Sequence, residues 1–390
     1  MTIFVTGGTG YLGSYVVTRL LEQHEDRLLL MVRGKSRDQA VDKLWKGLQL
    51  HMDAASFRAA LQRIDFVNGD LTAPGLGIQG DERRRVIDSA DSVLHIAASL
   101  NRKSEKACLN SNLRGTLNVI QLARDIAGGR GGLRRFSHVS TVAVCGQRDR
   151  EDVTEDTAID WERSDYDPYG RTKKFCEHMV RELLPDVPKT FFRPSIVMGD
   201  SRHPRTTQFD MVRATCVLVD APFVPMRADA RVDIVNADYV GRAIADIHVK
   251  QAPKYDCYHL SSGRLSKRAR EIDAALCAQV PGRRPARFAP GLEKPFARVM
   301  NGLASGPRSQ LSLIGSLFKV FMPYITFDTV FVNDRVREEL GEDPVPFTEY
   351  AGALYRWAKA HDYTYPYVAL PAEGEAGASA RAKKGAGAWA

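Results

Sequence analysis

The sequence lacks a long apolar run and any cysteine pattern that is typical of a metal site. No stretch of about 18 or more apolar residues occurs, so we expect no transmembrane helix. The most apolar segment, 311–327, contains Lys319 and Pro323, which predicts a packed helix followed by a strand; the alternative is a surface facing lipid or an acyl chain. The six cysteines form no CxxC pair, so we expect no metal and a reduced, cytoplasmic setting.

The sequence also lacks a targeting segment and a nucleic-acid-binding pattern. Residues 1–5 run directly into a glycine-rich turn, so we expect them to belong to the fold and not to a signal peptide. The net charge of +8 favours anionic ligands such as phosphorylated cofactors, coenzyme A or acidic carrier proteins. No compact basic run with interleaved aromatic residues accompanies this charge, so nucleic acid is not an expected partner.

The first half of the chain alternates short apolar segments with segments of helical periodicity. Strands are expected at 3–6, 28–32, 65–68, 92–96, 136–140 and 190–193, with helices between them that include 11–23, 112–126 and 169–184. This alternation predicts an α/β fold with a Rossmann-type, doubly wound parallel sheet. Ligands of such sheets bind beyond the carboxyl ends of the strands.

The alternation becomes less regular after about residue 200. Further strands are expected at 231–235 and 258–261, with a helix at 237–247 between them. We expect a Rossmann domain over 1–263, which includes some segments of a substrate lobe after about 200. A smaller, mostly helical C-terminal lobe facing the substrate follows over 264–370. The tail 371–390, rich in Ala, Gly, Lys and Glu, is expected to be disordered.

A glycine-rich segment with the sequence TGGTGYLG, residues 6–13, follows the first strand and opens a helix. Gly8, Gly10 and Gly13 fit GxGxxG, and Gly7, Gly10 and Gly13 fit GxxGxxG. A turn without Cβ atoms lets the backbone approach a pyrophosphate, and the helix N-terminus offers free N–H groups to it. The segment therefore predicts a dinucleotide site; the alternative is a purely structural turn.

The end of the second strand bears on the choice of dinucleotide. Arg33 follows this strand, and no Asp or Glu stands there to bind a ribose 2′-hydroxyl. A carboxylate would repel a 2′-phosphate, whereas an arginine can bind one bidentately. NADP(H) is therefore favoured over NAD(H), unless Arg33 is only a solvated charge at a strand end.

Two further strand ends carry residues suited to a nucleotide. Asp70 and Leu71 follow the third strand, where a carboxylate can accept the adenine amino group; a turn or helix-capping role for Asp70 is the alternative. Ala97 and Ala98 follow the fourth strand, and their small side chains let the backbone pass close to a cofactor.

The candidate catalytic residues are Tyr169, Lys173 and Thr141. Tyr169 and Lys173 are four residues apart on a predicted helix and therefore share one face, where the ammonium should lower the pKa of the phenol. A phenol tuned in this way can exchange a proton with a carbonyl oxygen or an alcohol. Thr141, at the end of the fifth strand, can donate to the same oxygen, although Ser140 remains possible. The alternatives are a surface helix and a hydroxyl that binds only the backbone.

Together these residues resemble the extended short-chain dehydrogenase/reductase family. Within it, the chain is most similar to the branch of thioester reductases and fatty acyl-CoA reductases, the male-sterility-type NAD-binding proteins. The resemblance covers about residues 1–265. It is carried by the segments 6–13, 70–77, 95–98, 112–116, 138–141, 169–177, 193–201 and 233–240.

The resemblance implies a role for each matching residue. The implied catalytic residues are Thr141, Tyr169 and Lys173, with Asn112 supporting the active-site helix and its water. The implied cofactor contacts are Gly7, Thr9, Gly10, Tyr11, Leu12 and Gly13 at the pyrophosphate, Arg33 and Lys43 at the 2′-phosphate, Asp70 and Leu71 at adenine, Ala97 and Ala98 along the cofactor, Lys173 at the nicotinamide ribose, and Pro194, Ile196 and Val197 at the nicotinamide. Threonine at 141 replaces the serine of many relatives and keeps the hydroxyl.

The activity implied by this branch is reduction of an acyl thioester, either acyl-CoA or acyl-carrier protein, or of the derived aldehyde by NADPH. A homodimer is also implied. Two other hypotheses remain open. One is another enzyme of the extended family, such as a hydroxysteroid-like dehydrogenase, a ketoreductase, or a nucleotide-sugar epimerase or dehydratase. The other is an NADP-sensing regulatory protein without turnover. Residues 264–390 match nothing securely, so the substrate itself is not predicted.

Overall fold

The fold is built on a parallel sheet of seven strands. A computed structural model describes residues 1–102, 104–306, 309–326 and 328–372 of the chain. The strands run in the order β11-β7-β5-β4-β1-β2-β3, and every neighbouring pair is parallel. Their bounds are β1 (Thr2–Thr6), β2 (Arg27–Val32), β3 (Ile64–Asn68), β4 (Ser92–His95), β5 (Arg135–Val139), β7 (Lys189–Pro194) and β11 (Cys257–Leu260). The predicted Rossmann-type α/β fold is therefore confirmed.

The register of the sheet brings the candidate strand ends together. Thr6, the last residue of β1, pairs with both Met31 on β2 and His95 on β4. Val139, the last residue of β5, pairs with Phe192 on β7. Because β1 and β4 are neighbours, the strand order reverses between them, and this reversal is where open α/β sheets bind ligands.

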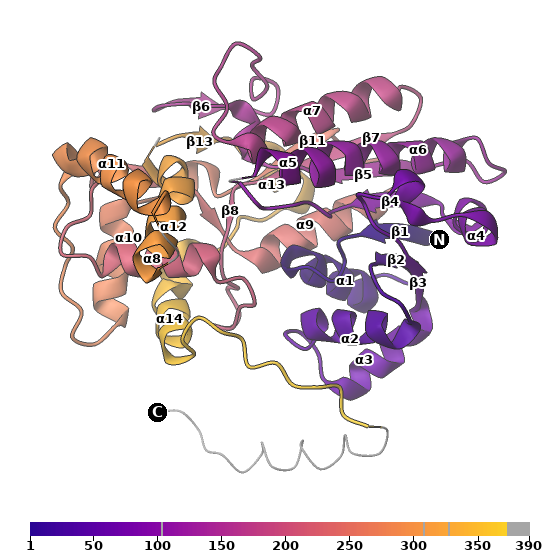
Figure 1. Cartoon of the computed structure of the whole chain (residues 1–390), viewed down its shortest axis with the longest axis horizontal. Coiled ribbons are helices and arrows are strands. Elements are labelled where there is room, and N and C mark those ends of the chain that lie inside the picture. The colour runs from indigo at the N-terminus through magenta and orange to yellow at the C-terminus, as the bar shows by residue number, and fades with distance from the viewer. Residues whose placement is uncertain (103, 307–308, 327, 373–390) are drawn as a thin grey trace.

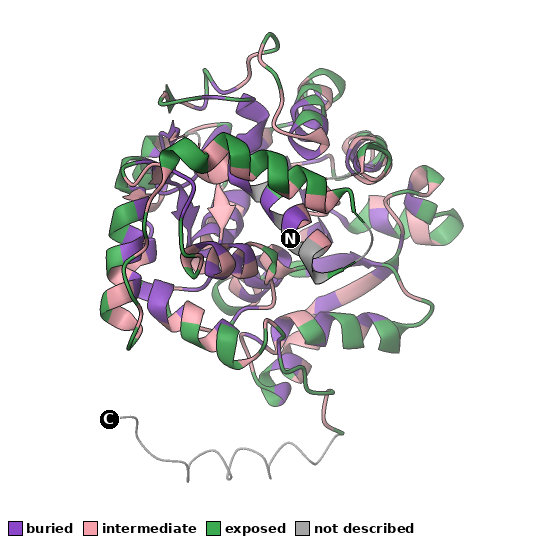
Figure 2. Cartoon of the chain, turned by 60° about the vertical axis from the view of Figure 1, so that its left-hand side comes forward, coloured by how far each residue is buried: buried purple, intermediate pink, exposed green. Residues whose placement is uncertain are grey.

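Helices cover both faces of the sheet (Figure 1). One face packs against α1 (Tyr11–Gln23), α2 (Arg37–Leu48) and α9 (Ala237–Val249), and the other against α4 (Gly80–Ser89), α6 (Gly115–Ala127) and α7 (Pro168–Leu183). Side chains alternate between these layers, since Ile3 and Val5 lie in the first core and Phe4 in the second. Figure 2 shows most of the central sheet as buried and the outer faces of the surface helices as exposed.

A second, mostly helical lobe lies beside the carboxyl end of the sheet (Figure 1). It contains α8 (Asp210–Val219), α10 (Ala269–Gln279), α11 (Glu293–Ala304), α12 (Gln310–Thr326) and α14 (Phe347–Ala360). Its core joins Val212 of α8 with Ile272, Phe318 and Leu354 of the later helices. Chain on both sides of residue 263 thus builds this lobe.

The last part of the chain returns to the sheet domain. β13 (Val330–Phe331) pairs with β6 (Asp152–Val153), and α13 (Asp334–Leu340) packs against α9 and β11. The Trp45 indole of α2 donates to the Val368 carbonyl at 2.8 Å, and Arg58 of α3 (Ala54–Ala60) donates to the Pro371 carbonyl. Of the tail expected to be disordered, residues 373–390 lie outside the described residues.

Three local features differ from the expectations drawn from the sequence. The expected strand 231–235 is two short strands, β9 (Arg231–Val232) and β10 (Ile234–Val235), which pair with β12 (Lys267–Arg268) and β8 (Ile196–Val197) respectively. The strand breaks because the buried Asp233 between them accepts hydrogen bonds from Ser195 and Ser262. The first residues of the expected helix 112–126 belong to a π-helical turn, Leu109–Arg114, which follows α5 (Glu105–Cys108), so α6 begins only at Gly115. Helix α12 continues through Pro323 to Thr326, so the strand expected to follow it, β13, begins only at Val330.

Among the residues that the structure describes, no helix has the length and apolar character that a bilayer span requires.

Candidate active site

A cleft of about 720 Å³ runs from the glycine turn along the carboxyl ends of the strands to the helical lobe. It is lined by every predicted site residue except Asn112 and Lys43. Those lining residues are Gly7, Thr9, Gly10, Tyr11, Leu12, Gly13, Arg33, Asp70, Leu71, Ala97, Ala98, Thr141, Tyr169, Lys173, Pro194, Ile196 and Val197. The folded chain therefore gathers segments that are almost 200 residues apart into one cleft, as the strand-end argument requires.

The glycine turn has the geometry that a pyrophosphate requires. Gly7 has a φ of +80°, and a Cβ atom there would lie 2.6 Å from the Ala97 nitrogen. A Cβ atom on Gly13 would lie 2.0 Å from the Gly7 carbonyl oxygen, so helix and turn approach more closely than any side chain allows. No described side chain caps the first turn of α1, and Tyr11, Leu12 and Gly13 of that turn line the cleft. The residues present thus fit a dinucleotide.

Two cations lie at the end of β2. The Arg33 guanidinium is 76% exposed and lies 3.9 Å from the Asp70 carboxylate, and the Lys43 ammonium donates to the Arg33 carbonyl. Lys43 therefore approaches the same strand end without lining the cleft itself. In this arrangement the exposed Arg33 guanidinium is accessible to a phosphate group.

Asp70 has a structural role in its turn as well as a place in the cleft. Its Oδ1 atom accepts hydrogen bonds from the Thr72 nitrogen and hydroxyl, both at 2.8 Å. The Thr72 backbone hydrogen bond lowers the pKa of Asp70. The turn role that the sequence left open is thus present, while the other carboxylate oxygen faces Arg33.

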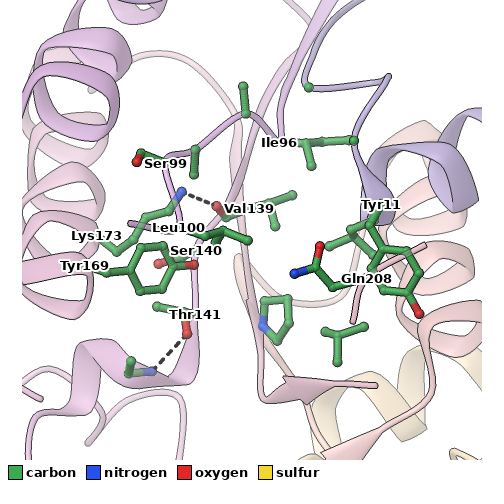
Figure 3. A pocket seen from close by; sticks show the side chains of 18 of the residues that line it. Tyr11, Ile96, Ser99, Leu100, Val139, Ser140, Thr141, Tyr169, Lys173 and Gln208 are labelled. Atoms are coloured by element: carbon green, nitrogen blue, oxygen red, sulfur yellow. Dashed lines mark hydrogen bonds between the residues drawn. The ribbon is translucent and has the colours of Figure 1, made fainter. Parts of the chain in front are cut away.

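Helix α7 holds Tyr169 and Lys173 against the cleft (Figure 3). Asp167 caps the helix by accepting from the Gly170 nitrogen at 2.8 Å. Farther along α7, Glu177 accepts a buried bidentate pair from Arg193 on β7, at 2.9 and 2.7 Å. These contacts fix both ends of the segment that carries the two candidate residues. Lys173 donates to the Val139 carbonyl at 2.7 Å.

The electrostatics of Tyr169 differ from the sequence-based expectation. Burial raises the pKa of Tyr169 above its ordinary value, and burial also lowers the pKa of Lys173. The charge that most lowers the pKa of Tyr169 is the Arg102 guanidinium, and the Thr141 hydrogen bond lowers it further. The expected lowering of the Tyr169 pKa by Lys173 was therefore wrong in its net direction, because desolvation outweighs the favourable charges.

The hydroxyls of Thr141 and Ser140 lie next to the Tyr169 ring (Figure 3). The Thr141 hydroxyl oxygen accepts from the Ala143 nitrogen at 3.2 Å, which is the backbone role that the sequence also allowed. Its proton stays available for a second partner, since this bond uses only a lone pair. The Ser140 hydroxyl is buried without a hydrogen-bond partner in the described part of the chain. Both hydroxyls therefore have a proton that could be donated into the cleft, and only Thr141 is held by a backbone hydrogen bond.

Asn112 acts behind the cleft wall. It lies in the π-helical turn, where its Oδ1 atom accepts from the Ser99 nitrogen at 2.7 Å. Its Nδ2 atom donates to the Ser99 carbonyl and to the Thr172 hydroxyl, both at 3.2 Å. Asn112 thereby ties the loop after β4 to α7, which fits the supporting role implied for it.

The sequence did not indicate several residues that line the cleft. They are Ser99, Leu100, Arg102, Ser111, Tyr166, Gln208, Met211, Arg231, Asp233, Tyr324, Asp328 and Phe331. They lie in loops, in short irregular elements such as the π-helical turn and the two-residue strands β9 and β13, and in the helical lobe, where no periodic pattern indicates which side chains meet. For Asp233 the only signal was its place in the segment 233–240; burial raises its pKa to about 6. Within the described ranges, no group of His, Cys, Asp or Glu is suited to hold a metal.

Comparison with known sequences shows that this chain is similar to NAD-binding proteins. Residues 5–244 match the family described as male sterility protein. The fatty acyl-CoA reductase wat of Drosophila melanogaster is 27% identical over 248 residues, which is 56% of this chain and 47% of that protein. The isonitrile lipopeptide synthase of Mycobacterium tuberculosis is 28% identical over 221 residues, or 52% of this chain and 8% of the synthase. The chain spans about half the length of the fatty acyl-CoA reductases it matches.

A solved structure gives the same picture over most of the chain. The terminal R domain from the myxalamid PKS-NRPS biosynthetic pathway aligns with a TM-score of 0.78 and 25% identity. The alignment covers 93% of this chain and 91% of that domain, so it includes the helical lobe as well as the sheet.

Proposed function

Because the chain belongs to the male sterility protein family of NAD-binding domains, we propose that it is an NADPH-dependent reductase of acyl thioesters or of the derived aldehydes. It is an extended short-chain dehydrogenase/reductase, and its cofactor is a nicotinamide nucleotide. The observation that carries the proposal is that one cleft is lined both by Tyr169, Lys173 and Thr141 and by the glycine turn and the strand ends beside it. The finer assignments, NADPH and the thioester, rest on Arg33 and on the relatives' names.

In the proposed mechanism, NADPH supplies a hydride to the carbonyl carbon when bound. The Thr141 hydroxyl donates to the substrate oxygen and Tyr169 gives it a proton. For a thioester, the resulting hemithioacetal collapses to an aldehyde and a thiol. Lys173 is held by the Val139 carbonyl within reach of the cleft and would bind the ribose hydroxyls.

The chemistry of thioester reduction also limits which molecules can carry the acyl group. Coenzyme A and acyl-carrier proteins present an acyl group on the same phosphopantetheine thiol, so one cleft can accept both. A thiolation-reductase di-domain aligns with this chain at 18% identity, which shows a shared fold. We propose that the acyl group is presented on the thiol of coenzyme A or of an acyl-carrier protein, and a binding assay with each distinguishes the two.

The proposed function is tested by following NADPH absorbance with panels of acyl-CoA, acyl-carrier protein and aldehydes. Product analysis separates aldehyde from alcohol and so gives the number of hydrides delivered. We expect turnover with at least one panel and little turnover with NADH. If all three panels are inert and a ketone or a nucleotide sugar reacts instead, the thioester assignment is excluded.

Replacing Arg33 with serine should weaken NADPH binding about tenfold to a hundredfold and leave NADH binding nearly unchanged. The change removes one charge-assisted bidentate contact to the 2′-phosphate, which NADH lacks. Fluorescence titration with both nucleotides measures the preference. Arg27→Ser is the matched control, because Arg27 pairs with Asp65 at the opposite end of the same strand. An unchanged preference for NADPH would mean that other residues bind the 2′-phosphate.

A further inference from the structure

Arg102 lies beside the proposed catalytic tyrosine at a position that no sequence motif indicates. It belongs to the loop between β4 and α5, and its guanidinium carbon is 4.6 Å from the centre of the Tyr169 ring. The same guanidinium is 4.4 Å from the centre of the Tyr324 ring. A cation over an aromatic face is attracted to the ring electrons, and this attraction increases when the phenol ionises. The stacking therefore favours the phenolate form of Tyr169.

A carboxylate at the start of α7 holds this arrangement. The Asp167 Oδ2 atom lies 3.4 Å from Arg102 and accepts from the Tyr324 hydroxyl at 2.8 Å. The Asp167 Oδ1 atom caps the helix that carries Tyr169. Because Tyr324 comes from α12, one carboxylate links the active-site helix, the loop of Arg102 and the helical lobe.

The lysine of the same helix does not provide this stacking. The Lys173 ammonium donates to the Val139 carbonyl, and Figure 3 shows the bond directed away from the Tyr169 ring. Among the groups that act on Tyr169, Arg102 lowers the pKa most, whereas Asp167 and Cys108 raise it. Geometry and charge thus both select Arg102 as the main cation at the phenol.

We propose that Arg102 is a positioning residue of the reductase site, which stacks on Tyr169, keeps its ring turned toward the cleft and stabilises its ionised form. The inference rests on the proposed function, because it assigns a partner to the proton donor of that reaction. In reduction, a more readily ionised Tyr169 is a better proton donor to the substrate oxygen. In the reverse reaction, a larger fraction of Tyr169 is ionised and can act as the base that takes a proton from the alcohol.

The pH dependence of this site involves groups from five elements. They are Arg102 from the loop after β4, Cys108 from α5, Thr141 from the segment after β5, Lys173 from α7 together with Asp167 that caps it, and Tyr324 from α12. Arginine keeps its charge at every pH at which the enzyme is folded. A shift caused by replacing Arg102 therefore reports the loss of its effect on Tyr169 and not its own titration.

The test compares Arg102→Gln and Arg102→Lys with the wild type in both reaction directions. We expect Arg102→Gln to lower kcat/KM for alcohol oxidation about tenfold near neutral pH, the effect of one lost charge beside the base. The alkaline limb of the reduction profile should move to higher pH, because Tyr169 then stays protonated longer. NADPH affinity should not change. Arg102→Lys should restore most of the rate, since it keeps the cation.

Arg181→Gln is the matched control. The Arg181 guanidinium lies 4.3 Å from the centre of the Phe191 ring and pairs with Asp256 at 2.8 Å, which reproduces the stacking and the ion pair outside the cleft. We expect its pH profile to match the wild type.

A second measurement does not depend on substrate. The near-ultraviolet absorbance of tyrosinate is titrated in each protein and in its Tyr169→Phe counterpart, and the difference isolates Tyr169. Arg102→Gln should move this component to higher pH. If the titration and the pH profile both stay unchanged while KM for the acyl substrate rises, Arg102 binds substrate and the proposal is overturned. If the wild type reduces no thioester or aldehyde, the proposed function fails, and the titration still decides the role of Arg102.

Discussion

Tyr169→Phe is expected to lower kcat for thioester and aldehyde reduction about a thousandfold while NADPH still binds. The substitution removes only the hydroxyl that gives a proton to the substrate oxygen, and such transfers contribute about 10²- to 10⁴-fold. The ring remains, so its packing against the Arg102 guanidinium is kept. Stopped-flow single turnovers with NADPH separate this chemical step from product release.

Tyr255→Phe provides the control for this prediction. The Tyr255 hydroxyl donates to Glu338 at 2.7 Å and neither residue lines the cleft, so its loss tests the effect of removing any tyrosine hydroxyl. Thermal unfolding should show both variants folded. A Tyr169→Phe enzyme with wild-type turnover would mean that another group, such as Ser140 or Thr141, supplies the proton, and the mechanism proposed here would be wrong.

Gly13→Ala is expected to weaken NADPH binding by about a hundredfold or more and to lower the melting temperature. The new Cβ atom would lie 2.0 Å from the Gly7 carbonyl oxygen and 2.9 Å from the Gly8 Cα atom, both of them backbone atoms that cannot rotate away. The turn and the start of α1 must therefore separate, which moves the N–H groups from the pyrophosphate and costs about 1–3 kcal/mol in packing alone. Calorimetric titration with NADPH and a thermal melt measure the two effects.

Gly302→Ala is the matched control, because a Cβ atom on that residue of α11 meets no described atom within 4 Å apart from its own helix backbone. This variant should bind NADPH normally and be at least as stable as the wild type, since alanine favours a helix over glycine. Wild-type NADPH affinity in Gly13→Ala would contradict the close approach of helix and turn.

Much of the sheet domain was predictable because its signals are local. The strands expected at 3–6 and 28–32 are Thr2–Thr6 and Arg27–Val32, and the helix expected at 169–184 is Pro168–Leu183. Apolar alternation and helical periodicity depend on neighbours a few residues away, so they can be recognised along the chain. The short strands β6, β8, β12 and β13 have only two residues each and carry no such pattern.

The same physical limit decides which features of the cleft could be predicted from the sequence. The sequence by itself determined the glycine turn, the four-residue spacing of Tyr169 and Lys173 and the strand ends proposed to hold a nucleotide, because each is a short-range pattern. Only the tertiary structure decided that Arg102 and Tyr324, 222 positions apart, meet at the Tyr169 ring. It also decided that burial outweighs the nearby cations in setting the pKa of that phenol. Burial and long-range contact depend on how the whole chain packs, and no local pattern records them.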